Sequence, residues 1–327
     1  MSKLLSRKVL VPTLIIIGAL VILNLLPFPG VVLPEISIPA EPVFDLFGFP
    51  ITNTLLASWL TMVVLILGSW LVTRNLKTVP GRLQGAFEMI IEGMYNLVEG
   101  AAGRERARRF FPIVMTIFLF VIVSNWLGLT PLFGGWGVLH HAEHGQAVEW
   151  LNDSHSFGLW TRAEAEAHDG DYYVLAPMFR AATTDMNVTL ALAIVSVFMT
   201  QVYGVQALGV GYFSKFLALP SLAKAFRPGI GCGGRIGAFG MGIIDTFIGI
   251  VESISEVGKV VSFSFRLFGN IFAGEVLLGV MAFLIPYIVS LPFYGLEIFV
   301  GLVQALVFMM LSVAFFVVAT SGHGAEH

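Results

Sequence analysis

Charged and amide side chains stand in the most apolar part of the sequence, at spacings that assign them to faces of one helix. In the stretch SFSFRLFGNIFAGE, Arg266 precedes Asn270 by four residues and Glu275 by nine. A helix turns about 100° per residue, so Arg266 and Asn270 are neighbours on one face, whereas Glu275 points roughly half a turn away. Glu252 and Lys259 extend the stripe of the arginine toward the N-terminus at intervals of seven residues.

These residue types can separate and move protons. An arginine keeps its positive charge, and inside a bilayer it costs ~2.5–3.5 kcal/mol on insertion scales. Carboxylates can exchange protons when burial favours their neutral form. A permanent cation between two groups of carboxylates therefore indicates an electrostatic divider with a proton route on each side. In the competing interpretation, Arg266 simply pairs with Glu252 or Asn270 inside a bundle. Asp245 and Glu256 either line such a route or pair with the nearby lysine, and the spacing favours neither.

A second polar cluster lies near the C-terminus, where Glu297, Gly301 and Gln304 recur at helical spacing and share one face. If the helices that carry Glu275 and Glu297 are antiparallel neighbours, the two carboxylates lie close together. Two nearby carboxylates in a low-dielectric path do not both ionise, so we expect them to share a proton.

The composition fits a protein that crosses the membrane several times. The chain has 327 residues, of which 57% are hydrophobic and only 12% charged, and soluble domains rarely show this balance. A net charge of −3 gives no basic surface for nucleic acid. One cysteine excludes an internal disulfide framework, and no phosphate-loop or dinucleotide-binding motif is present. We therefore expect an all-α polytopic membrane protein that uses no cofactor or metal.

Apolar runs about as long as a bilayer-crossing helix occupy residues 51–72, 111–132 and 188–208. An earlier run, 9–26, follows basic residues and is either a signal peptide or an additional membrane anchor. Its length and the lack of an obvious small-residue cleavage site favour the anchor. We therefore separate a segment 1–44, with the anchor and an outer linker, from a membrane domain 45–327.

The last apolar region is too long for one upright helix. Between 239 and 285 there is no proline, and as one helix this stretch would extend ~70 Å, against ~30 Å of hydrocarbon. It must either lie strongly tilted or break into two spans. Apart from Gly269–Asn270 no turn chemistry marks a break. We therefore expect one steeply tilted helix, followed by a long return helix over 293–320, which together form a helical hairpin.

Charge alternates between the connecting segments and orients the chain. Segments 74–109 and 210–240 carry seven and four basic residues, whereas 27–50 carries three acidic residues and no base, and 134–180 carries seven acidic residues and two bases. The positive-inside rule places the first two segments in the cytoplasm and the other two outside. With this orientation we expect the C-terminus in the cytoplasm.

Three smaller signals allow two interpretations each. The run 80–103 has an apolar face at helical spacing, so it is a helix on the cytoplasmic membrane surface or a soluble linker helix. Five of seven histidines, including those of HHAEH (140–144), lie in the outer loop 134–180. They form a zinc site or, more simply, part of a solvated buffering loop. The basic run 104–109 contacts anionic headgroups or only marks the cytoplasmic side.

The motif FSFRLFGNIFAGE resembles the signature of subunit a of the rotary ATP synthases, the membrane stator of the proton-driven Fo motor. Further blocks are similar to that family in the same order: VPGRLQGAFEMIIEG (79–93), FFPIVMTIFLFVIVSNWLGLTP (110–131), TTDMNVTLALAIVSVF (183–198) and LVQALVFMMLSVAFF (302–316). The resemblance covers roughly residues 45–320. It implies an α-helical membrane fold with a tilted hairpin against the rotor, in a bacterial-type plasma membrane.

The resemblance also implies roles for residues that match the family's motifs. Arg266 matches the arginine that faces the ion-carrying carboxylate of each passing c subunit. Glu252 matches a carboxylate of the half-channel toward the cytoplasm, and Asp185 with Asn187 matches the polar pair that opens the fourth block. The outer half-channel of the family is matched by Asn270, Glu275 and Gln304. The implied partners are the c-ring, the peripheral-stalk subunit b, the remaining F1Fo complex and membrane lipid.

The chain departs from the family at Glu275 and Glu297, because one of these two positions often carries a histidine. Both are glutamate here, and no predicted span contains a histidine. We expect the carboxylate pair to replace a histidine in the outer route. The expected function is that of a non-catalytic, proton-conducting stator subunit that couples proton flow to rotation and ATP synthesis. Two alternatives are an ion-coupled secondary transporter, which would show inverted repeats, and a polytopic membrane enzyme, which would need a clustered metal or nucleophile set.

Overall fold

A computed structural model describes residues 38–130, 133, 137–142, 146–147, 172–209, 211–212, 232–284 and 290–321. The predicted anchor 9–26, most of the histidine-containing loop and the basic stretch 213–231 lie outside the described residues. The described helices are α2 (Asn53–Thr73), α3 (Arg82–Ala102), α4 (Arg104–Gly128), α5 (Met186–Leu208), α7 (Cys232–Leu284) and α8 (Ser290–Thr320).

Five of the described helices are long and apolar enough to cross a membrane. They are α2, α4, α5, α8 and the 42-residue stretch Met241–Ala282 of α7. These helices overlap the runs that the sequence predicts as spans. The all-α polytopic fold class is therefore confirmed.

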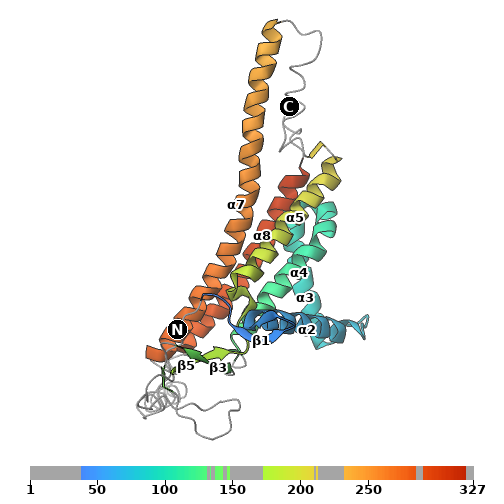
Figure 1. The fold of residues 1–327 in the computed structure, drawn as a ribbon. Helices are drawn as coiled ribbons and strands as arrows, with labels where there is room; N and C mark the ends of the chain where they lie inside the picture. The colour runs from blue at the N-terminus through green and yellow to red at the C-terminus, as the bar shows by residue number, and fades with distance from the viewer. Residues whose placement is uncertain are drawn as a thin grey trace, which may run out of the picture. The chain divides into compact units, whose positions relative to one another are not determined.

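The long C-terminal region forms one unbroken helix. α7 has 53 residues and a length of about 80 Å, and Figure 1 shows it (orange) as the longest helix of the chain. The alternative of two shorter spans with a break near Gly269–Asn270 is wrong, because both residues lie within the helix. The tilt of α7 in the bilayer stays a prediction.

A single glycine separates α3 from α4. Gly103 adopts φ 78°, and its N–H donates to the Glu99 carbonyl at 2.9 Å. Positive φ is available to glycine without a steric penalty, so the chain turns here with no loop. α4 then begins at Arg104, so the basic run 104–109 forms its first turns and the helix starts earlier than predicted. The predicted amphipathic run corresponds to α3, and its contact with a membrane surface stays a prediction.

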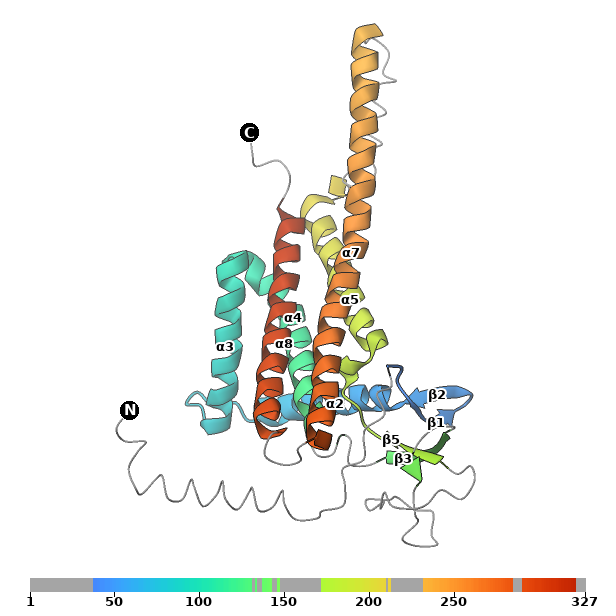
Figure 2. The ribbon, with the colours of Figure 1, turned by 90° about the vertical axis from the view of Figure 1, so that its left-hand side faces the viewer.

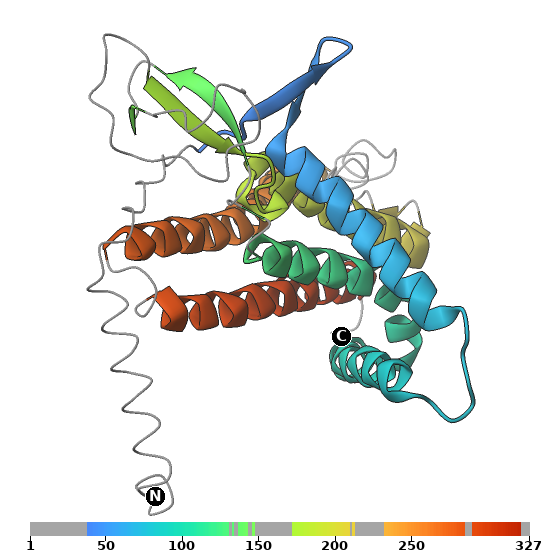
Figure 3. The same cartoon turned by 90° about the horizontal axis from the view of Figure 1, so that it is seen from below.

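Two small antiparallel sheets precede and follow the first helices, and the sequence analysis did not predict them (Figure 3). In one, β1 (Pro42–Leu46) pairs with β2 (Phe49–Thr52). In the other, β5 (Tyr172–Pro177) pairs with β3 (Gly137–Ala142) and β4 (Gln146–Ala147). β5 leads directly into segment 178–185, which supplies residues to the candidate site.

The chain divides into two compact units, each described here by itself. Unit 1 comprises Met1–Leu65, Val121–Asp185 and Gly269–Val303. Unit 2 comprises Ile66–Phe120, Met186–Phe268 and Gln304–His327. In both units α8 packs beside α4, as Figure 2 shows (red and green), with contacts Asn125–Gly301 in unit 1 and Phe110–Phe316 in unit 2.

Unit 2 has an aromatic core. Phe110, Tyr203 and Phe316 come from α4, α5 and α8, all three are buried, and their ring centroids lie 4.8, 5.0 and 5.3 Å apart. The hydroxyl groups of Ser196 and Ser312 lie 2.7 Å apart in the same interior. Aromatic pairs in this geometry contribute ~0.5–1.5 kcal/mol each beyond the area they bury.

Many hydroxyl groups of the apolar helices bond within their own helix. The Thr61 and Ser312 hydroxyls donate to the carbonyls four residues earlier, at 2.8 and 2.9 Å. On the exposed surface of α7, Thr246 and Ser253 do the same at 2.7 and 2.9 Å. These donors therefore need no partner from another helix.

Candidate functional site

Several polar residues of unit 1 converge on one pocket. Its volume is about 250 Å³, and its walls come from the end of α4, the segment after β5, the last turns of α7 and the first turns of α8. Its polar lining includes Asn125, Arg180, Thr184, Glu275, Tyr294 and Glu297. Two of the predicted site residues, Glu275 and Glu297, therefore line the same cavity.

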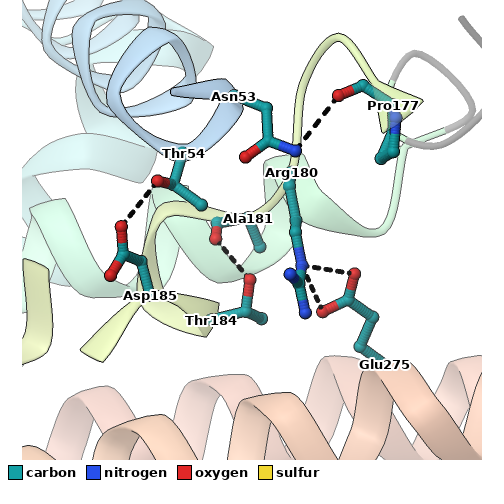
Figure 4. A network of polar contacts seen from close by, with 8 residues as sticks. All are labelled: Asn53, Thr54, Pro177, Arg180, Ala181, Thr184, Asp185 and Glu275. Atoms are coloured by element: carbon teal, nitrogen blue, oxygen red, sulfur yellow. Dashed lines mark hydrogen bonds and ion pairs between the residues drawn. The ribbon is translucent and has the colours of Figure 1, made fainter. Parts of the chain in front are cut away.

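Arg180 holds Glu275 at the wall of this pocket (Figure 4). Its Nε donates to both carboxylate oxygens of Glu275, at 3.0 and 3.1 Å. The guanidinium also lies 5.7 Å from the ring centroid of Phe272, one turn earlier on α7. The arginine side chain is only 8% exposed, whereas the glutamate side chain is 41% exposed. Glu275 is thus a carboxylate with a fixed cation on one side and an accessible surface on the other.

The first residues of α2 fix the segment that carries Arg180. The Asn53 amide donates to the Pro177 carbonyl at 3.2 Å, and the Thr54 hydroxyl donates to Asp185 Oδ2 at 2.7 Å (Figure 4). Asn53, Thr54 and Asp185 are all buried. The predicted site residue Asp185 therefore acts here as an anchor at the C-terminal end of segment 178–185, with Arg180 between the two attachment points.

Asn125 connects the same segment to two further helices. Its side-chain oxygen accepts a hydrogen bond from the Thr183 hydroxyl at 2.6 Å, and its amide donates to the Gly301 carbonyl at 3.2 Å. Asn125 is 4% exposed. A buried amide whose oxygen and nitrogen are both bonded keeps α4, segment 178–185 and α8 in register, because loss of either bond would leave a polar group unsatisfied.

Glu297 is the second carboxylate of the pocket and is 7% exposed. Its carboxylate lies directly over Gly274 of α7, and a methyl group added at that glycine would overlap it. Among the described residues no ion pair of Glu297 occurs. The two glutamates therefore differ in surroundings: one has a guanidinium, and the other is buried against backbone.

The remaining predicted residues do not line this pocket. Arg266 and Asn270 are exposed on α7, and Gln304 and Glu252 are half-buried on α8 and α7. Within the described part of the chain, Arg266 forms no hydrogen bond or ion pair. Pairing of Arg266 with Glu252 or Asn270 is therefore not observed.

The lysine on the stripe of Arg266 has a local partner in unit 2. Lys259 Nζ donates to Glu256 Oε1 at 2.8 Å, three residues apart on α7, and lies 4.9 Å from the ring centroid of Phe315. For Glu256 this favours pairing with the lysine over the channel-lining interpretation.

Arg180 and Asn125 were not predicted from the sequence as site residues. In the sequence, Arg180 is only one of two basic residues in an acidic loop. Its partner is 95 residues away, so no local spacing could reveal the pair. The one available signal was a lone cation five residues before Asp185.

The profile of the family described as ATP synthase A chain matches residues 55–317. The chain belongs to this family. It is similar to ATP synthase subunit a of Moorella thermoacetica, with 26% identity over 286 residues that cover 87% of this chain and 98% of that protein. The resemblance of the motifs is confirmed, and with five apolar helices in its described part the chain is an integral multi-pass membrane protein.

Proposed function

We propose that this chain is the proton-conducting stator subunit of an ATP synthase Fo motor, with one half-channel on each side of Arg266. Membership of the ATP synthase A chain family supports the role in general. The observation that carries the proposal is the exposed Arg266 in a 42-residue apolar stretch of α7. A cation in such surroundings is costly unless an anion approaches it. A carboxylate on the rotor ring of c subunits would supply that anion.

The proposed outer route uses Glu297, Gln304, Glu275 and Asn270. A proton from outside reaches the rotor carboxylate through these groups and neutralises it. A neutral acid is much cheaper in lipid than an ion, so the rotor can then turn that site into the bilayer. The subunit itself makes and breaks no covalent bond to carbon or phosphorus.

The proposed inner route passes Glu252. After nearly a full turn the rotor carboxylate meets this aqueous path and loses its proton toward the cytoplasm. Arg266 then attracts the ionised carboxylate and keeps protons from passing directly between the routes. Asp185 supports the outer route indirectly, through its hydrogen bond to Thr54.

The proposal includes the surroundings of the subunit. We place domain 45–327 in a bacterial-type plasma membrane with its C-terminus in the cytoplasm, against the c-ring and beside subunit b of the peripheral stalk. Segment 1–44 serves as an additional anchor with an outer linker. Copurification with a ring of small two-helix subunits would separate this proposal from the secondary-transporter alternative.

The deciding experiment is ATP-driven proton pumping in inverted membrane vesicles that hold the whole complex. We expect Arg266→Ala to abolish pumping and Arg266→Lys to fail nearly as completely, because the compact ammonium differs from the guanidinium in geometry and hydration. Arg106→Ala is the matched control, since Arg106 is exposed and, among the described residues, its guanidinium bonds only the Ser321 hydroxyl. Pumping at the wild-type rate in Arg266→Ala would reject the proposed function.

A further inference from the structure

The cation that contacts the Glu275 carboxylate does not come from an apolar helix. Arg180 belongs to segment 178–185, between β5 and α5. Asn53 donates to the Pro177 carbonyl just before this segment, Thr54 donates to Asp185 at its end, and Thr183 within it donates to Asn125. The arginine is therefore presented by a rigid support. A support of this kind is typical of a residue whose position matters to a neighbouring group.

The two carboxylates of the pocket stand in different surroundings. Glu275 accepts two contacts from Arg180 Nε, and a nearby cation favours the charged form of a carboxylate. Glu297 is buried against Gly274, and burial without a cation favours the neutral form. Two carboxylates whose surroundings differ in this way usually take different roles in proton transfer.

We propose that Arg180 is a positioning residue that holds Glu275 as a permanent anion, so that Glu297 is the carboxylate of the pocket that exchanges protons. This inference rests on the proposed function of the subunit. It replaces the expectation that the two carboxylates share a proton, because the guanidinium compensates one of the two charges. The groups that face the carboxylates are Arg180 from segment 178–185, neutral Asn125 from α4 and Tyr294 from α8.

The test measures passive proton flux through the complex in vesicles stripped of the catalytic head, per assembled complex and as a function of pH. We expect Arg180→Ala to lower the flux by about tenfold, the order for loss of a charge-assisted hydrogen bond. It should also add an ionisation to the flux–pH profile, because Glu275 then titrates. Arg180→Lys should restore most of the flux and the original profile.

A double variant separates positioning from simple loss of structure. If Arg180 acts through Glu275, Arg180→Ala combined with Glu275→Gln is no slower than the slower single variant, because both changes remove the same contact. If the double variant instead loses flux by the product of the two single-variant factors, the inference is overturned. A normal flux per complex and an unchanged profile in Arg180→Ala would also overturn it, even if less complex assembles, because the arginine would then only hold the fold.

ATP-driven pumping by Arg266→Ala, in inverted vesicles that keep the catalytic head, separates failure of the proposed function from failure of the inference. If this variant pumps normally, the proposed function fails and the inference fails with it. If it stops pumping while Arg180→Ala conducts normally at every pH, only the inference is overturned.

Discussion

In unit 1 the polar contacts around the pocket join segments far apart in the chain, whereas the Lys259–Glu256 ion pair of unit 2 is local to one helix. The residues of the Arg180–Glu275 pair are 95 positions apart, and those of the Thr54–Asp185 hydrogen bond 131. Lys259 and Glu256 are only three positions apart. Unit 2 also has an aromatic core and long-range contacts in which at most one partner is charged, such as Thr189–Ser264 at 3.1 Å and Arg109–Gln206 at 2.6 Å.

This difference separates two uses of charge. A pair three residues apart can form whenever α7 is helical, because the helix alone brings the side chains together. A pair between distant segments forms only in the folded chain, and it fixes a carboxylate relative to a cavity. The Arg180–Glu275 pair therefore controls geometry at the pocket of unit 1, while the charges of Lys259 and Glu256 in unit 2 balance each other within α7.

The largest expected effect is that of Glu297→Gln. Proton transfer by a positioned side chain contributes ~10²–10⁴-fold to rate, so we expect passive flux to fall by about 100-fold or more. The flux–pH profile of Glu297→Gln should also lose an ionisation. Glu275→Gln should instead lower the flux by one factor that is the same at every pH, so its profile keeps its shape. Glu88→Gln, at an exposed carboxylate of α3, is the control. A Glu297→Gln profile of unchanged shape would show that Glu297 does not exchange protons.

A medium effect is expected at Gly274. A methyl group there would overlap the Glu297 carboxylate, and overpacking costs ~1–3 kcal/mol. If this displaces the carboxylate, Gly274→Ala lowers the flux by about tenfold, since ~1.4 kcal/mol corresponds to that factor. Gly295→Ala is the matched control, because nothing lies within 4 Å of a Cβ at that position. Equal flux in both variants would show that the close approach to Gly274 is unimportant.

The smallest effect is expected when the local pair of unit 2 is removed whole. Replacing a mostly buried ion pair with neutral residues of similar size is often nearly neutral. The double variant Glu256→Gln with Lys259→Met should therefore conduct within about twofold of wild type, whereas Lys259→Met alone should be slower because it leaves the carboxylate without its lysine. If this double variant is as slow as the double variant Arg180→Ala with Glu275→Gln, the ion pairs of the two units do not differ in their importance for proton flux.

The sequence predicted the helices because each is specified by its own residues. The unbroken α7 followed from the absence of proline over a stretch too long for one upright span. The hairpin β1–β2 was missed because its turn residues, Phe47 and Gly48, have φ 52° and 83°. A two-residue turn with both φ positive normally has the sequence Asn-Gly or Asp-Gly. A phenylalanine at the first position therefore does not indicate a turn.

The candidate site was predictable only on its helices. Glu275 and Glu297 lie on α7 and α8, whose pairing as a hairpin could be expected from their order in the chain. Arg180 reaches Glu275 because of the path of segment 178–185, and Asn125 of α4 bonds to the same segment through Thr183. This path depends on contacts with α2. No period or motif in the sequence encodes such a path. The remaining assignments, from Arg266 to Gln304, are still predictions.

The hydroxyl groups of α7 that bond to their own backbone bear on how a neighbouring surface could move along this helix. Thr246 and Ser253 are exposed, yet each donates to a carbonyl of its own preceding turn. A helix that slides past them has no hydrogen bond to break at one position and remake at the next. The interaction energy of a sliding partner with such a face therefore varies little from one position to the next, although the face contains polar residues.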